Sequence, residues 1–505
     1  MDENGRKRNL KAEATRWLIF FGVAIVLSVL LWLGLSLTGR KNPITSFGTL
    51  VSDSSVTVGI EGNAPKSLDI RTEQGTAVEQ ALLGNVYETL VSRSETNKLQ
   101  PGIASSWQAS DDGLTYTFTL NGGMTFANGH KLDSSDVVWS LQNAVNNHYV
   151  GADQLGDLKE ITNPNANTVV ITLAKPNPRL LRALAGRAGV VYDAESKTNY
   201  AKSAVGSGPF TVSTAEQSQI VLQRNDSYWG KKAASSQVTL YYYANEESMA
   251  DAMKAGKISM ALPLSASTAS ELGKTNGLTA DDKVMLAFNN DNNSPFSDEQ
   301  IRKMTRYAID AKTIAKNAPD AYAPLGGPIS PLEDGYEDLS GLYLYNLEQG
   351  QRMRTYFGVN YIAPIDILVP KEYESIGNDV KTAIDTNLEV LDSAADVTER
   401  MNAGTYNIAL TTMSDEGDAS VFDNGQSVFH FENGDAQQAY ANAMAATNDN
   451  DYQARMRDYA RAVSENAASD WLYTRKNFLA VSDGLQGYPK NLTDRLLPLN
   501  RLTLH

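Results

Sequence analysis

Two kinds of hydrophobic periodicity, one typical of strands and one of helices, occur between Leu99 and Leu141. Apolar and threonine positions alternate over residues 114–120, which predicts a strand with one buried face. Asp112-Gly113 precedes this strand with typical turn chemistry, since glycine accepts a positive φ without steric cost. Asn128-Gly129 predicts a second tight turn.

Directly after the second turn the apolar spacing changes from strand to helix. Val137, Val138 and Leu141 fall on one helical face, and we expect Ser134 or Ser135 to cap a helix that starts at the next aspartate. The pattern alone indicates strands and a helix in an α/β domain. Similar patterns predict further elements along the chain, namely strands at 55–60, 168–173 and 238–243, and helices at 246–254, 301–310 and 451–468.

A helix is also expected after the loop 61–75. Thr76 or a neighbouring residue would cap it, and Val78, Leu82, Val86 and Leu90 form a stripe at four-residue spacing. This stripe predicts a helix that continues towards residue 90.

The N-terminal part of the chain differs from everything that follows. Residues 17–37 are almost uninterrupted apolar sequence, and as a helix they would span about 30 Å, one hydrocarbon core. Five basic residues precede this run, so the positive-inside rule predicts a cytoplasmic tail at 1–16 and an extracellular remainder. A cleaved secretory signal is the alternative, although Leu35-Ser-Leu-Thr-Gly39 is a poor cleavage site. Residues 38–54 predict a short tether.

Length, charge and cysteine content narrow the classes of protein that are possible. A chain of 505 residues exceeds one hydrophobic core, so two or three domains are expected. The net charge is −15 overall and +4 over residues 1–41, which leaves −19 for the remainder and argues against nucleic acid as a partner. No cysteine is present, which excludes disulfides, thiolate metal sites, cysteine nucleophiles and a lipid-modified cysteine anchor.

The residue identities carry a family resemblance that the periodicities do not. The string from Leu99 to Leu141 resembles the signature of extracellular solute-binding proteins of the peptide/nickel class, which serve ABC importers. Further resembling strings are Val86-Tyr-Glu-Thr-Leu-Val91, Val205-Gly-Ser-Gly-Pro-Phe210, Asn225-Asp-Ser-Tyr-Trp-Gly230 and Ile301-Arg-Lys-Met-Thr-Arg-Tyr-Ala-Ile-Asp310. The resemblance covers about 55–325 firmly and 360–490 loosely. The glycine-rich string at 205–210 lacks the lysine and the spacing of a phosphate loop.

The resemblance implies a fold and a division of the chain. The expected fold is α/β and periplasmic-binding-protein-like, of the type II, three-region peptide-binding variant, with two lobes, a ligand cleft between them and one N-terminal transmembrane helix. The expected segments are 1–16 (cytoplasmic tail), 17–37 (transmembrane anchor), 38–54 (tether), 55–92 (lobe 1), 93–204 (small extra domain of lobe 1), 205–282 (lobe 1), 283–474 (lobe 2) and 475–505 (lobe 1).

The resemblance also points to candidate ligand contacts. In peptide-binding relatives the backbone before the first helix faces the ligand, and an aspartate in a lobe 2 loop pairs with the ligand's ammonium group. An ordinary connecting loop and a solvated acidic loop are the alternatives at these two places. Met413 and Ala419 stand where relatives carry tryptophan and proline, which puts the second assignment in doubt. The candidate contacts in this chain are Gln74, Gly75, Thr76, Asn289, Met413, Asp415 and Asp418.

No catalytic, metal or cofactor site is expected. The four histidines, at 130, 148, 430 and 505, have no partner at metal or triad spacing. The resemblance therefore implies a monomeric, membrane-anchored extracellular protein that captures oligopeptides for the permease subunits of an ABC importer. Two alternatives stay open: a scaffold or sensor that kept the fold without transport, and a glycan receptor with aromatic residues in its cleft.

Overall fold

The computed structural model describes residues 54–273, 275–356, 365–413, 418–491 and 496–505. The chain divides into two units, Met1–Asp53 and Ser54–His505, and every described residue belongs to the second. The expected membrane helix at 17–37 therefore lies outside the described residues. Within the described ranges, no helix is both long enough and apolar enough to cross a bilayer.

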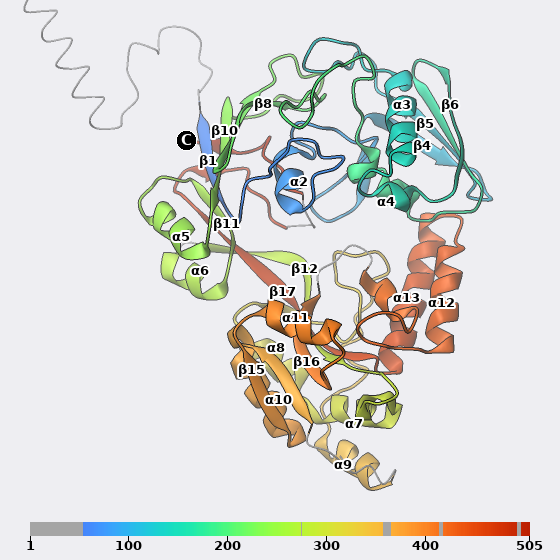
Figure 1. Ribbon diagram of the computed structural model, residues 1–505, viewed down its shortest axis with the longest axis vertical. Helices are drawn as coiled ribbons and strands as arrows, with labels where there is room; N and C mark the ends of the chain where they lie inside the picture. Colours follow the sequence, from blue (N-terminus) through green and yellow to red (C-terminus); the bar gives the residue numbers. More distant parts are fainter. Residues whose placement is uncertain (1–53, 274, 357–364, 414–417, 492–495) are drawn as a thin grey trace, which may run out of the picture. The chain divides into compact units, whose positions relative to one another are not determined.

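One mixed sheet runs through most of the described chain (Figure 1). Its first half contains the parallel strands β1, β10 and β11 together with the antiparallel hairpin β8–β9. Its second half contains β14, β15 and β16. The strand order is β15 (Asn387–Leu391), β14 (Asp366–Pro370), β16 (Ile408–Met413), β12 (Thr275–Phe288), β17 (Ser469–Val481), β11 (Met260–Leu264), β1 (Ser55–Glu61), β10 (Gln237–Tyr243), β9 (Gln219–Arg224) and β8 (Phe210–Glu216), with β13 (Ala321–Pro324) paired to β17.

Two long antiparallel strands, β12 and β17, connect the two halves of the sheet. Lys283–Phe288 of β12 pairs with β16 in the second half, whereas Phe478–Val481 of β17 contributes the partners of β11 in the first half. The pairing between β12 and β17 shifts register between Thr279 and Lys283. A second shift lies between Val284 and Met285. An irregular register locally disrupts a ladder, so the two crossing strands pair less regularly over this stretch.

The second half of the sheet is covered on both faces, as the period-2 pattern of β12 requires. Met285 and Ala287 enter one core, whereas Val284, Leu286 and Phe288 enter the other. The first core lies against α11, α12 and α13, and the second against α7, α8 and α10 (Figure 1). The bounds of these helices are Glu299–Ala308 (α7), Ala311–Asn317 (α8), Glu374–Ile384 (α10), Ala394–Asn402 (α11), Gly434–Met444 (α12) and Asp449–Glu465 (α13).

A separate four-stranded sheet follows the first helix and confirms the strand predicted at 114–120. In β5 the side chains of Tyr116, Phe118 and Leu120 are buried and alternate with threonines. These residues pack against Val137 and Leu141 of α3. The order is β4 (Ala104–Ala109), β5 (Thr115–Leu120), β7 (Thr168–Leu173) and β6 (Leu158–Asn165), followed in the chain by the short helix α4 (Leu180–Ala183) and preceded by the hairpin β2 (Val91–Arg93) and β3 (Leu99–Pro101).

Helix α3 (Ser134–Asn146) begins two residues earlier than predicted, and its cap is different. Asp133 is the N-cap, and its carboxylate accepts a hydrogen bond from Ser135 N at 3.0 Å. Asp136 closes a capping box by accepting from Asp133 N at 2.9 Å. The predicted cap at Ser134 or Ser135 is wrong because an aspartate one residue upstream supplies both halves of this motif.

Helix α2 (Thr76–Leu82) is much shorter than the apolar stripe predicted. Its N-cap position is Gly75, which makes no side-chain cap bond, and the chain leaves the helix at Leu83. Gly84 has a φ of +73°, a conformation that ends the helical run. Val86 and Leu90 are nevertheless buried, so their spacing reflected core positions rather than one continuous helix.

Three of the resembling strings meet around one carboxylate, that of Glu88. It accepts hydrogen bonds from Ser207 Oγ (2.8 Å), Tyr228 OH (2.6 Å) and Trp229 Nε1 (2.8 Å). Burial raises the pKa of Glu88, and the three donors oppose that shift. A Cβ on Gly206 would lie 1.9 Å from Val86 O, so the glycines at 206 and 208 serve close backbone packing.

Candidate ligand-binding cavity

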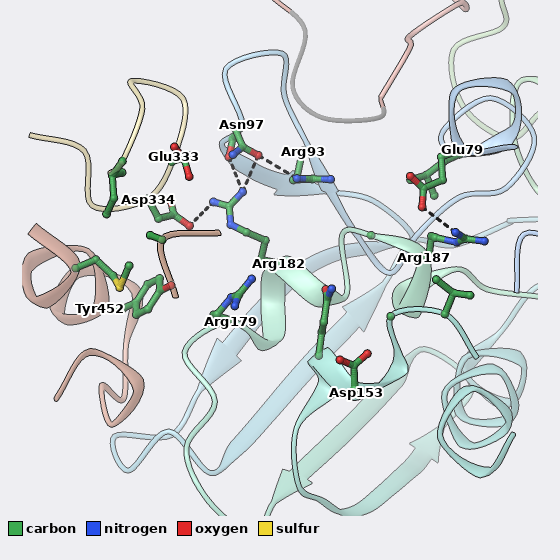
Figure 2. Close-up of a pocket in the computed structure, with 18 residues that line it drawn as sticks. Glu79, Arg93, Asn97, Asp153, Arg179, Arg182, Arg187, Glu333, Asp334 and Tyr452 are labelled. Carbon is green, nitrogen blue, oxygen red and sulfur yellow. Dashed lines mark hydrogen bonds and ion pairs between the residues drawn. The ribbon is translucent and has the colours of Figure 1, made fainter. Parts of the chain in front are cut away.

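A cavity of about 180 Å³ lies where the first sheet half and the small sheet meet loops of the second half. On one side it is lined by residues of α2, of the β2–β3 hairpin and of the segment 179–187 around α4. On the other side it is lined by residues of loop 329–334 and of α13, including Tyr452 (Figure 2). Charged side chains of both signs therefore face one small space.

Arg182 of α4 makes the most direct link across this cavity. Its Nη2 lies 2.5 Å from Asp334 Oδ2, and both side chains are 21% exposed. Its Nη1 donates to the Asn97 carbonyl at 3.1 Å and to Asn97 Oδ1 at 2.7 Å. Asn97 in turn donates from Nδ2 to the Leu332 carbonyl at 2.8 Å. Figure 2 shows Arg182 between Asn97 and Asp334. Loop 329–334 is thus held by two polar contacts from the opposite wall.

A second ion pair lies deeper in the same cavity. Arg187 Nη1 is 3.2 Å from Glu79 Oε1, and the two side chains are only 6% and 3% exposed. Arg187 also donates from Nε to the Ile70 carbonyl at 2.8 Å, and its Nη2 contacts the Glu73 carbonyl. The pair therefore fixes α2 and the loop before it against the segment that follows α4 (Figure 2).

Glu333 forms an ion pair with a lysine of the crossing strand β12. Lys283 Nζ lies 2.7 Å from Glu333 Oε2, with the lysine fully buried and the glutamate side chain 8% exposed. The same carboxylate oxygen accepts a hydrogen bond from Ser330 N at 2.5 Å. Loop 329–334 is therefore anchored directly on the strand that joins the two sheet halves.

Burial and neighbouring charges shift the pKa of Tyr452 and of Asp449 on the second wall. Burial raises the pKa of Tyr452 to about 12, while Arg179 opposes the shift. Burial also raises the pKa of Asp449, and the nearby Asp334 adds to that effect, whereas Arg182 lowers it. The lining arginines thus all lie on the α4 side of the cavity, together with the acidic Glu79 and Asp153, whereas Glu333 and Asp334 lie on the opposite side.

The predicted contacts at the start of α2 do not line this cavity. Gln74, Gly75 and Thr76 are exposed, and a Cβ on Gly75 would meet nothing within 4 Å. The same helix does reach the cavity one turn later, through Glu79 and then Leu83 at its C-cap.

The predicted contacts of the second half are distributed differently. Asn289 is buried and donates to the Tyr406 carbonyl at 2.9 Å, so it shapes the turn after β12 and does not line the cavity. Met413 is a buried core residue at the end of β16, opposite Lys283 in the register. Asp415 lies outside the described residues. Asp418 begins a short 3-10 helix, Asp418–Phe422, whose next residue, Ala419, lines the cavity.

Sequence reasoning did not single out the charged residues that define the cavity. The signal that could have found them is the concentration of basic residues at 179, 182 and 187, within nine residues of an otherwise acidic chain. Their partners on the opposite wall, Glu333 and Asp334, have no such sequence signal, because acidic residues are common throughout this chain.

A second cavity of about 570 Å³ adjoins the first and shares Leu83 and Arg93 with it. Its lining is rich in hydroxyl and amide groups, such as Ser92, Thr96 and Asn500. Among the described residues, no group of three histidine, cysteine or acidic side chains is arranged to hold a metal ion.

Solved substrate-binding proteins of ABC transporters share the fold of this chain. The substrate-binding protein CtaP of Listeria monocytogenes has a TM-score of 0.78 with this chain at 17% identity, covering 89% of this chain and 99% of CtaP. DppA of Helicobacter pylori, solved with the peptide STSA, has a TM-score of 0.68 at 18% identity, covering 90% and 98%.

The sequence identifies the family within that class. Residues 98–359 match the family described as "Bacterial extracellular solute-binding proteins, family 5 Middle". The chain belongs to this family. The glutathione-binding protein GsiB of Salmonella paratyphi A (strain ATCC 9150 / SARB42) is 26% identical over 310 residues, which are 59% of this chain and 60% of GsiB. The chain thus matches about three fifths of the length of this curated relative.

Proposed function

We propose that this protein is the extracellular substrate-binding protein of an ABC importer and that it captures short peptides in the cavity between the two sheet halves. The observation that carries the proposal is the mixed charge of that cavity. A peptide brings an ammonium and a carboxylate group, and burying either one without a partner is costly. The arginines on one side and the carboxylates of Glu333 and Asp334 on the other offer a partner to each of these groups.

The relatives support the same class of ligand. GsiB is a glutathione-binding protein, and the DppA structure holds a peptide. Glutathione and short peptides share free carboxylate and ammonium groups on a small, extended main chain. A glycan ligand is less well supported, since the described lining of the cavity contains Tyr452 as its one aromatic side chain.

The proposed mechanism is a hinge. We assign 55–92, 205–282 and 475–505 to lobe 1, 93–204 to its extra domain and 283–474 to lobe 2, so that β12 and β17 are the connections that bend. A ligand shifts the balance between open and closed forms only through contacts that differ between them. A peptide that touches both walls of the cavity satisfies this condition.

The sequence supports our proposal for the N-terminal 54 residues. We place 1–16 in the cytoplasm, 17–37 in the membrane and 38–54 as a tether, so that the monomeric binding domain is held near its permease at high local concentration. Alkaline carbonate extraction of membranes tests the anchor, which predicts that the protein stays in the pellet. The seven contacts that the resemblance implies stay proposals, namely Gln74, Gly75, Thr76, Asn289, Met413, Asp415 and Asp418, with Asp415 as the proposed partner of the ligand's ammonium group. Because none of the described ones lines the cavity, these contacts require a ligand that extends beyond it.

Calorimetry on the full chain in detergent tests the function. Titration with di-, tri- and tetra-alanine is expected to give one site per chain for at least one length, and mass spectrometry should recover the peptide unchanged. Arg400→Gln is a control that should bind peptide as wild type does. The Arg400 side chain is 40% exposed, and its ion pair with Glu389 lies outside the cavity. No binding of any peptide, or hydrolysis of one, would contradict the proposal. Binding without peptide uptake in cells would favour a sensor.

A further inference from the structure

Two arginines of one short segment approach the cavity from the same side. Arg179 is the N-cap residue of α4, and Arg182 lies within that helix. Both line the cavity, and Figure 2 shows them on the same side of it, with Asp334 paired to Arg182. Two guanidinium groups on one wall favour a ligand with a planar anionic group.

The two arginines differ in their present partners. Arg182 already has a carboxylate, that of Asp334, at 2.5 Å. The charge of Arg179 acts to lower the pKa of Tyr440 and of Tyr452, and the described residues include no ion pair to Arg179. Arg179 is also partly exposed, so a ligand has access to it. Among the described residues, Arg179 is therefore a cavity-lining arginine without an ion-pair partner.

We propose that Arg179 and Arg182 together bind the carboxylate of the ligand, and that Asp334 occupies part of this carboxylate site until the ligand arrives. This inference rests on the proposed function and adds the orientation of the peptide, with its C-terminus at α4. A carboxylate is the chemistry that fits, because a guanidinium fork binds its two oxygens in one plane. Asp334 already demonstrates that fit on Arg182.

The proposal assigns opposite effects to the two members of one ion pair. Loss of Arg182 removes a ligand contact and weakens binding. Loss of the Asp334 charge removes a competitor for the same guanidinium and strengthens binding. A purely structural role for the pair predicts losses in both variants, since either change breaks the same contact.

Calorimetry with tri-alanine and tri-alanine amide tests the inference on the full chain. We expect the wild type to bind the acid about ten- to hundredfold more tightly than the amide, as for loss of a charge-assisted hydrogen bond. Arg179→Met should weaken the acid about tenfold or more and leave the amide nearly unchanged, and Asp334→Asn should tighten the acid. Arg400→Met should change neither affinity.

The possible failures are distinguishable. Equal affinity of wild type for the acid and the amide overturns the inference while leaving peptide binding intact. Equal weakening of both ligands by Arg179→Met, or weakening of the acid by Asp334→Asn, also overturns it. Binding of neither ligand overturns the proposed function and this inference with it. The comparison of acid with amide uses wild-type protein, so it stands even where a variant does not fold.

Discussion

The ion pair between Lys283 and Glu333 makes a quantitative prediction about how the crossing strand supports the cavity. At 2.7 Å and an effective dielectric constant of about 20, two unit charges attract by about 6 kcal/mol. Desolvation of each buried ion costs several kcal/mol, so the intact pair contributes little net stability. Removing the lysine alone is different, because a glutamate that is 8% exposed then loses its counter-ion.

Lys283→Met should therefore lower the free energy of unfolding by about 3–5 kcal/mol. With a urea m-value of about 3 kcal/mol/M, the midpoint would fall by about 1–1.7 M. Adding Glu333→Gln should restore about 2 kcal/mol, since the uncompensated carboxylate is then gone. Lys303→Met is the control: Lys303 pairs with Glu299 on the surface of α7, and its loss should cost no more than about 0.5 kcal/mol.

Equilibrium urea unfolding of the single and double variants measures all of these quantities. A Lys283→Met variant within about 1 kcal/mol of wild type would contradict a buried, uncompensated Glu333 carboxylate. So would a double variant whose losses simply add, because additive losses mean that the two charges do not compensate each other.

Three further predictions concern packing, capping and pH. A Cβ on Gly113 (φ +67°) would lie 2.9 Å from the Cα of Thr447, whereas a Cβ on Gly123 (φ +73°) would meet open space. Gly113→Ala should therefore lower the free energy of unfolding by about 1–3 kcal/mol more than Gly123→Ala. Equal losses of stability in urea unfolding would contradict the contact with Thr447. Asp133→Ala should cost about 1 kcal/mol through loss of the α3 cap, and a melting temperature equal to wild type would argue against that cap. Burial raises the pKa of Glu88 above its ordinary value of 4.5, so the folded state holds this proton more tightly and its contribution to stability falls as the pH rises from 4.5. Unfolding of wild type and Glu88→Gln between pH 4 and 7 should give curves whose separation changes with pH, not parallel curves.

Much of the fold was accessible from the sequence because its signals are local. Alternation over 114–120 predicts β5, and the expected helix at 246–254 coincides with α5 (Glu246–Lys254). The four-residue spacing of Val78, Leu82, Val86 and Leu90 led to a helix predicted too long. Four buried positions at this spacing can belong partly to a helix and partly to the chain that leaves it. Capping by Asp133 was missed because two serines beside it are equally good caps by type.

The cavity was less accessible, because its residues come from distant parts of the chain. Arg182 and Asp334 are 152 positions apart in the numbering and meet only through the fold. The resemblance implied ligand contacts at Gly75 and in the loop after Met413. It did not indicate Arg179 and Arg182, because none of the resembling strings contains them.

A crystal structure of the full chain grown with tri-alanine would show where the peptide binds. We expect one intact peptide between the two sheet halves, in contact with both the α4 arginines and residues of the second half. A peptide bound elsewhere on the surface, cleaved products, or an empty cavity at saturating peptide would contradict it.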